Sequence, residues 1–78
     1  MKYLSNDIRI LQENKEITFS VNSYIEKQDK SSWLFITDSN INLNPEDSFM
    51  VILPDVTIPN ARITIPRVDG FVFGNHTK

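Results

Sequence analysis

The sequence offers few side chains that could act as a nucleophile and its base. It has no cysteine and one histidine, His76, close to the C-terminal end of the 78 residues. A serine nucleophile would need this histidine as its base, yet chain ends are usually too poorly ordered to hold an imidazole in place. We therefore expect no catalytic triad, no catalytic residue and a protein that is not an enzyme.

Five acidic residues could in principle supply the carboxylate pair of a hydrolase. They are Asp38, Glu46, Asp47, Asp55 and Asp69. Each stands beside Asn, Pro, Ser or Gly, where short polar side chains satisfy backbone groups in turns. A chain this short also has little material for a cleft of roughly several hundred cubic ångströms. We interpret these acids as turn residues, and a hydrolase is the least favoured alternative.

A calcium loop is suggested and then excluded by spacing. Asp38, Asn40 and Asn42 match the first half of such a loop. The sixth position requires glycine and is Leu43, and the twelfth requires glutamate and is Phe49. Without cysteine there is also no thiolate site and no disulfide. We expect neither a metal nor another cofactor.

Aromatic and basic residues are the remaining candidates for binding. Five of them form the candidate partner-binding set: Trp33, Arg62, Arg67, Phe71 and Phe73. They could build a stacking platform for single-stranded nucleic acid in an OB-like barrel. The formal net charge of −2 disfavours this, because phosphate contacts dominate such binding. Aromatic residues and arginine are also enriched in protein interfaces, which is the interpretation we favour.

Residues 71–73 suggest how a partner would bind. Phe71, Val72 and Phe73 place apolar side chains on both faces of one strand near the C-terminus. If this is an edge strand, one face fills the core and the other needs cover from a subunit or a partner. The alternative, given equal weight, is that the strand pairs inside the sheet and is covered within the chain.

Strand patterns dominate the first half of the chain. Ile17, Phe19 and Val21 alternate with polar residues, and Glu13 begins a polar turn, which predicts a hairpin over residues 7–25. Residues 4–12 fit either a strand or a helix, because some apolar residues fall at helical spacing, although the isoleucines favour a strand. The apolar run 33–36 predicts a strand buried on both faces or one with an exposed aromatic residue.

The second half is divided by turns and prolines. We expect a short strand around Ile41 and Leu43, a turn at residues 44–47 and a central strand at 49–53. Pro59 and Pro66 limit residues 56–58 and 62–65 to short, edge-like strands, because proline cannot donate to a ladder.

These segments make about six or seven short strands. The predicted fold is all-β: a small antiparallel β sandwich or partly open barrel, with residues 1–78 as a single domain and a frayed tail from about residue 74. A core this small, without disulfide or metal, is marginal, so we expect a homo-oligomer or a protein partner.

The expected function is a non-enzymatic protein–protein interaction module. One form would be a phage or mobile-element accessory protein that inhibits a host factor. The alternatives are an OB-like binder of single-stranded nucleic acid and a structural subunit of a larger assembly, such as a virion component. No apolar run approaches the ~18 residues of a membrane span, and no signal peptide is recognisable, so we expect a cytoplasmic protein.

Overall fold

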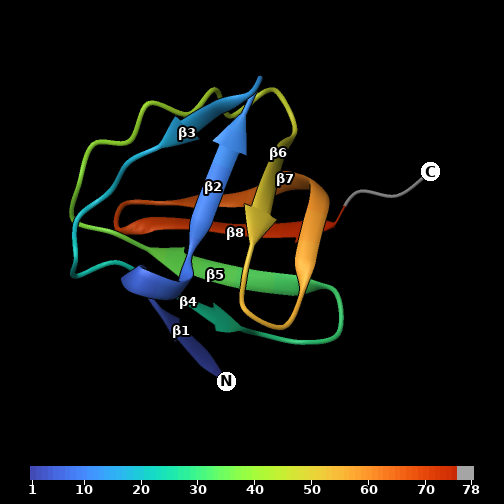
Figure 1. Cartoon of the computed structure of the whole chain (residues 1–78). Helices are drawn as coiled ribbons and strands as arrows, with labels where there is room; N and C mark the ends of the chain where they lie inside the picture. The colour runs from blue at the N-terminus through green and yellow to red at the C-terminus, as the bar shows by residue number, and fades with distance from the viewer. Residues whose placement is uncertain (76–78) are drawn as a thin grey trace.

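The computed structural model describes residues 1–75 as one antiparallel sheet of eight strands that curls into a half-barrel (Figure 1). The strands are β1 (Lys2–Leu4), β2 (Arg9–Gln12), β3 (Lys15–Ile17), β4 (Tyr24–Lys27), β5 (Ser32–Ile36), β6 (Phe49–Ile52), β7 (Thr57–Arg67) and β8 (Gly70–Asn75). Their order in the sheet is β1-β4-β5-β8-β7-β6-β2-β3. A 3₁₀ turn, η1 (Ser5–Asp7), joins β1 to β2.

The predicted all-β, partly open barrel is confirmed, with eight strands in place of six or seven. Residues 4–12, which the pattern leaves open between strand and helix, contain the end of β1, the 3₁₀ turn and the strand β2. The predicted tail from residue 74 is wrong at its start, because Gly74 and Asn75 belong to β8. The rest of that tail, including His76, lies outside the described residues.

The first hairpin is real but shorter than residues 7–25. Glu13 and Asn14 have φ angles of 53° and 67°, as a two-residue type I′ turn requires, and Ile10 pairs with Ile17. The strand pattern then fails: Val21 is 81% exposed. The Ser20 N–H is held by the Ser39 hydroxyl at 2.8 Å, so the chain leaves the sheet there.

The strand β8 lies in the middle of the sheet, paired with both β5 and β7. The prediction of an edge strand at residues 71–73 is therefore wrong. A tight turn at Val68 and Asp69 folds β8 back along β7, and β5 covers its other side. The actual edges are β1 and β3.

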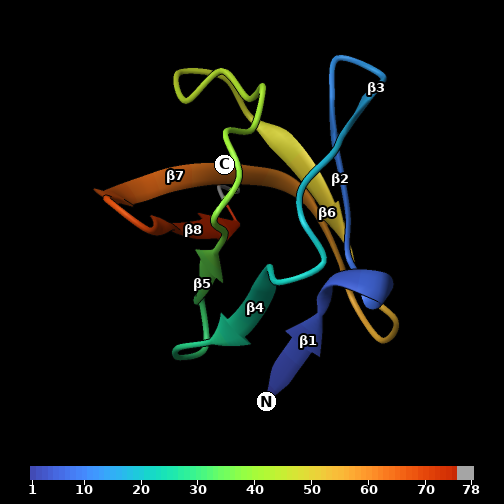
Figure 2. The ribbon, with the colours of Figure 1, turned by 90° about the vertical axis from the view of Figure 1, so that its left-hand side faces the viewer.

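The two short strands predicted around Pro59 and Pro66 are one strand, β7, of 11 residues. Its first half pairs with β6 and its second half with β8. Each pairing contains a register shift, and such bulges are where a ladder tolerates proline. Figure 2 shows β7 as a long curved ribbon, and its curvature lets one sheet wrap around a core.

Residues 38–48 form no strand, contrary to the prediction around Ile41 and Leu43. Both side chains are half-buried and pack against the core, but no neighbouring strand offers its backbone. The predicted turn at residue 44 is confirmed, since the Asn44 carbonyl accepts the Asp47 N–H at 3.3 Å. The predicted strand at 49–53 is confirmed as β6, between β7 and β2.

The core fills the concave inner side of the half-barrel. Its fully buried members include Ile10, Ile25, Phe35, Val51 and Phe73. Phenylalanine rings form a connected set within it, with Phe35 and Phe73 each within 6.0 Å of the Phe71 ring centre. Burying these rings supplies most of the stabilisation that a domain without disulfides needs.

Candidate functional site

The three predicted aromatic site residues lie in the core. Trp33, Phe71 and Phe73 are 6%, 6% and 0% exposed. The expected stacking platform or apolar edge built from them is therefore wrong. They face inward because they occupy alternate positions of β5 and β8, on the side that also carries Phe35.

The two predicted arginines are exposed but engaged elsewhere. Arg62 donates to the Glu46 carbonyl at 3.3 Å. Arg67 donates to both oxygens of Asp69, at 2.9 and 3.3 Å, and this hydrogen bonding lowers the pKa of that carboxyl group. Five residues of extended strand separate the two arginines by about 16 Å. The structure does not gather them with the aromatic residues into one site.

Trp33 has the most unusual surroundings of the predicted residues. Its ring stacks on Phe73 with centroids 5.8 Å apart, and the Lys27 ammonium lies 4.3 Å from the ring centroid. Its indole N–H is buried and has no hydrogen-bond partner among residues 1–75. Because this residue is the only tryptophan, its fluorescence reports on the inner side of the sheet.

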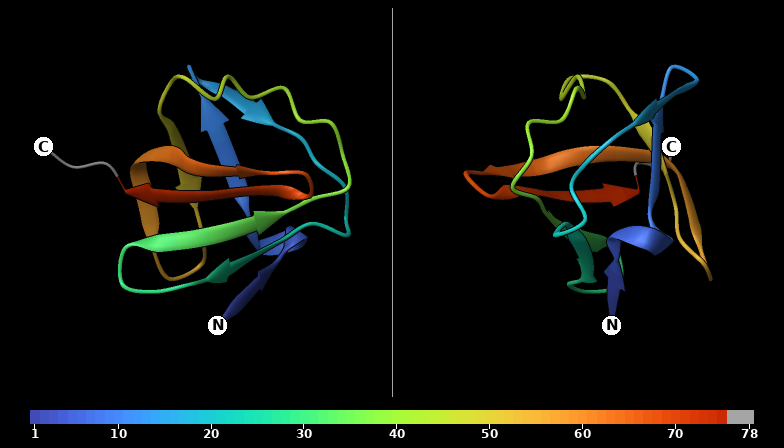
Figure 3. Two further views of the ribbon diagram at one scale, coloured as in Figure 1. Left: turned by 180° about the vertical axis from the view of Figure 1, so that it is seen from behind. Right: turned by 60° about the vertical axis from the view of Figure 1, so that its left-hand side comes forward.

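A second apolar surface lies on the opposite side of the same strands. Its members point outward because side chains alternate between the two faces of a strand. The register between strands places them side by side: Leu34 lies beside Val72, Val72 beside Ile65, and Tyr24 beside Ile36. We call this the outer apolar face, and it consists of Leu4, Tyr24, Leu34, Ile36, Ile65 and Val72. Its strands are seen from behind in Figure 3, left.

The outer apolar face is open to solvent. Leu4 is 62% and Ile65 56% exposed, and the other members are half-buried. Five neighbouring strands and two outward rows of side chains cover about 300 Å², of which the six apolar positions take about 180 Å². Charged side chains of Lys2, Glu26 and Arg67 surround it, and the Lys2 ammonium lies 4.4 Å from the Tyr24 ring centroid.

Sequence reasoning missed this face although its signal was present. In residues 33–36 and 71–73, both the odd-numbered and the even-numbered positions are apolar, so each strand has apolar side chains on both faces. The prediction of apolar side chains on both faces of residues 71–73 is confirmed, but residues 33–36 are neither buried on both faces nor marked by an exposed aromatic residue. The larger aromatic side chains instead fill the core, and the smaller Leu34 and Val72 face outward.

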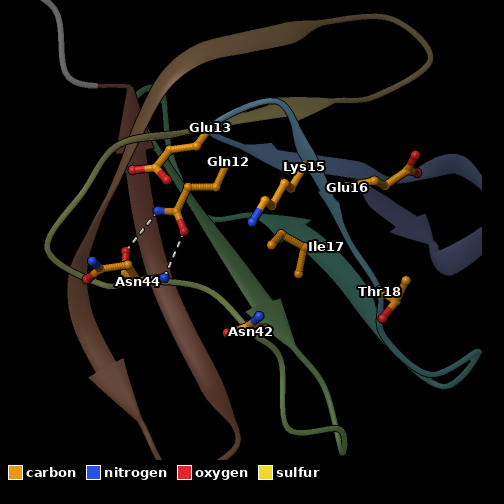
Figure 4. A pocket seen from close by; sticks show the side chains of 8 residues that line it. All are labelled: Gln12, Glu13, Lys15, Glu16, Ile17, Thr18, Asn42 and Asn44. Carbon is orange, nitrogen blue, oxygen red and sulfur yellow. Dashed lines mark hydrogen bonds between the residues drawn. The ribbon is translucent and has the colours of Figure 1, made fainter.

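A cavity of about 350 Å³ opens at the other edge of the sheet, between β3 and residues 42–44 (Figure 4). We call it the edge trough. It is lined by Gln12, Glu13, Lys15, Glu16, Ile17, Thr18, Asn42 and Asn44. Figure 4 shows Lys15 and Ile17 directed from β3 toward the trough, whereas Glu16 points away.

The buried Gln12 side chain holds one end of the trough together. Its amide N–H₂ donates to the Asn44 carbonyl at 2.9 Å, and its oxygen accepts the Asn44 N–H at 2.8 Å. Longer contacts of the same N–H₂ group reach the carbonyls of Asp47 and Ser48. The loop is thus attached to the hairpin by a side chain that copies the pairing of a strand.

A cluster of hydroxyl groups and one carboxylate joins the same two segments at the other end. The Ser20 hydroxyl and the Asn22 amide donate to Asp38, and these hydrogen bonds lower the pKa of Asp38. The Ser23 hydroxyl donates to Thr37 at 2.7 Å. A carboxyl group with a lowered pKa is a poor general base, so the cluster serves to connect the segments.

Two further kinds of site are not found in the described part of the chain. Residues 1–75 hold no group of three or more acidic or histidine side chains placed to bind a metal ion. Within the same residues no helix has the length and apolar character needed to cross a membrane.

Comparison with known proteins gave no match to a family model, to a curated protein or to a solved structure.

Proposed function

We propose that this chain is a non-enzymatic protein-interaction module that binds a partner protein through the outer apolar face. The observation that carries the proposal is the set of six outward apolar side chains, placed together by the register of five strands and covered by no other described part of the chain. An apolar centre with a charged rim is the usual composition of a protein interface.

The size of the face suggests the strength of binding. Covering about 180 Å² of apolar surface on each of two partners contributes about 9 kcal/mol of apolar burial at 25 cal/mol/Å². Lost rigid-body freedom and side-chain ordering oppose this by about 4–15 kcal/mol. The two contributions are of similar size, so the face supports weak, transient binding, as expected of an interface below about 1,000 Å², and the charged rim adds specificity.

An accessory protein of a phage or mobile element that covers a host factor in the cytoplasm fits the small size and the absence of cysteine. A structural subunit would use the same face to meet a copy of itself. No observation favours binding of single-stranded nucleic acid, because the aromatic residues that would stack on bases are buried.

The test compares two exposed apolar positions. Ile65→Asp places a charge on the outer apolar face, and Val21→Asp places the same charge in a loop outside it. Tagged protein is used to capture partners from nuclease-treated lysate, and the purified variants are examined by sedimentation equilibrium. We expect wild type and Val21→Asp to bind a protein or to self-associate, and Ile65→Asp to lose this binding while its circular dichroism is unchanged. Equal behaviour of the two variants in both assays contradicts the proposal.

A further inference from the structure

We infer that the edge trough binds an extended peptide segment of a partner protein, which adds as a strand between β3 and residues 40–44. This site lies at the opposite edge of the sheet from the outer apolar face and does not depend on it. The inference is based on the outer edge of β3 and on the backbone of residues 40–43, which make no hydrogen bond to each other.

The first backbone is the outer edge of β3. In a two-residue hairpin the pair that flanks the turn, here Gln12 and Lys15, is hydrogen-bonded. Pairing alternates along the ladder, so the N–H and C=O of Glu16 point away from β2, toward the open edge. Neither group makes a hydrogen bond to another described residue. The edge thus presents a donor and an acceptor to an incoming strand.

The second backbone is the opposite wall. Residues 40–44 alternate between exposed Asn40, Asn42 and Asn44 and half-buried Ile41 and Leu43, which is the period of a strand. No strand forms because no neighbour offers its backbone. Gln12 already bonds the N–H and C=O of Asn44, so the backbone that is free to pair with a ligand strand is that of residues 40–43.

The two walls are held apart rather than free to close. At one end the Ser39 hydroxyl accepts the Ser20 N–H at 2.8 Å. At the other end Gln12 holds Asn44 through two bonds of 2.8 and 2.9 Å. Between these two connections no backbone hydrogen bond joins β3 to the described loop residues. The trough is therefore preformed, which lowers the cost of ordering on binding.

The dimensions suit a short extended segment. At the spacings of a packed sheet, one strand residue occupies about 160 Å³. The cavity of about 350 Å³ then holds about two residues. Because hydrogen bonds connect the walls at both ends of the trough, the neighbouring residues of the ligand leave through its open side. The Asn42 side-chain amide can donate to and accept from a peptide backbone, whereas the Asn44 amide is bonded to Asp47 and Glu46.

Side chains of β3 indicate which peptide fits. Lys15 and Ile17 point into the trough, and Lys15 forms no ion pair with another described residue. Glu16 points away and pairs with Arg9 at 3.2 Å. A matching ligand carries an acidic residue beside Lys15 and an apolar residue beside Ile17. These two positions are separated by one residue, because side chains on one face of a strand repeat every two residues.

The experiment uses two capped synthetic pentapeptides, Thr-Val-Thr-Asp-Thr and the same peptide with Lys in place of Asp. Binding to the isotope-labelled protein is followed by backbone amide shifts. We expect the acidic peptide to shift the amides of Glu16 and Asn42 and to bind more tightly than the basic one. Lys15→Glu should reverse this preference, and equal binding of both peptides to both proteins overturns the inference.

A second pair of variants tests the backbone bond. Glu16→Pro removes the outward N–H but none of the hairpin's own bonds, whereas Glu16→Ala keeps that N–H and loses the same side chain. We expect Glu16→Pro to weaken the acidic peptide about tenfold and Glu16→Ala to leave its binding unchanged. Ile65→Asp should bind the peptide as tightly as the wild type does. Failure of binding at the outer apolar face and failure of peptide binding in the edge trough are therefore distinguished. One further result would overturn the inference: neither peptide shifts the amides, but the protein self-associates and Glu16→Pro abolishes this self-association. In that case the edge of β3 pairs with a second copy of the chain and not with a peptide.

Discussion

Neighbouring residues of β8 should respond very differently to truncation. Phe73 is fully buried, and its ring centre lies 5.8 Å from Trp33 and 5.7 Å from Phe49. Val72, the preceding residue, is half-buried on the outer apolar face. The change of Phe73→Ala therefore removes a central core ring, whereas Val72→Ala removes two methyl groups from a partly solvated surface.

The expected costs follow from burial. Phenylalanine-to-alanine changes in a core cost about 3–5 kcal/mol, and loss of two half-buried methyl groups costs about 1 kcal/mol or less. A domain of this length has a total free energy of unfolding of about 4–12 kcal/mol. Phe73→Ala should thus remove about a quarter or more of the free energy of unfolding. Phe73→Asp, which also buries an unpaired charge, should not fold.

Urea unfolding measured by far-ultraviolet circular dichroism gives the comparison. With a slope of about 1 kcal/mol per molar urea, Phe73→Ala should lower the midpoint by about 3–5 M and Val72→Ala by about 1 M or less. Circular dichroism is preferred to fluorescence because Phe73 stacks on the only tryptophan. A larger effect of Val72→Ala than of Phe73→Ala would refute the assignment of inner and outer faces.

Three other changes have defined outcomes. Gly70→Ala should destabilise the fold by about 2 kcal/mol or more in thermal unfolding, because the residue has φ of 152° and an added Cβ would lie 1.9 Å from the Phe35 carbonyl oxygen. Tyr3→Phe should cost about 1 kcal/mol at neutral pH by losing the 2.9 Å bond to Asp55. Asp38→Ala should lower the urea midpoint at pH 7 but much less at about pH 2.

The pH dependence of two of these variants follows from the direction of each pKa shift. Burial and then the bond to Asp55 raise the pKa of Tyr3, so its contribution is present below the ordinary value of 10.0 and is lost as the pH rises further. Hydrogen bonds lower the pKa of Asp38, so its contribution is present above the ordinary value of 3.8 and is lost as the pH falls. The opposite trend for either residue would contradict these assignments.

Local patterns predicted the elements that local interactions determine. The turn at Glu13 and the strand β6 follow from turn chemistry and a continuous apolar run, and both are confirmed. The position of β8 could not be predicted, because strand order depends on pairing between residues distant in sequence. Residues 40–44 show the same limit: they have the period of a strand but no partner.

The candidate site was predicted only in part. Two-faced apolar strands at 33–36 and 71–73 were recognised in the sequence, and both carry the outer apolar face. Each strand has two alternate sets of side chains, and the set that faces outward lies on the convex side of the curved sheet. The register shifts in β7 contribute to this curvature. The edge trough was not predicted, since it forms where the loop after β5 returns beside β3.

The proposed function requires that a protein contacts the outer apolar face. Photo-crosslinking tests this contact, with a benzoylphenylalanine placed at position 65 and the same group at position 21 as the control. Irradiation of the folded, labelled protein with nuclease-treated lysate, or with copies of itself, should yield a defined protein adduct from position 65 and none from position 21. Equal adducts from both positions, or none from position 65, would contradict the proposed function.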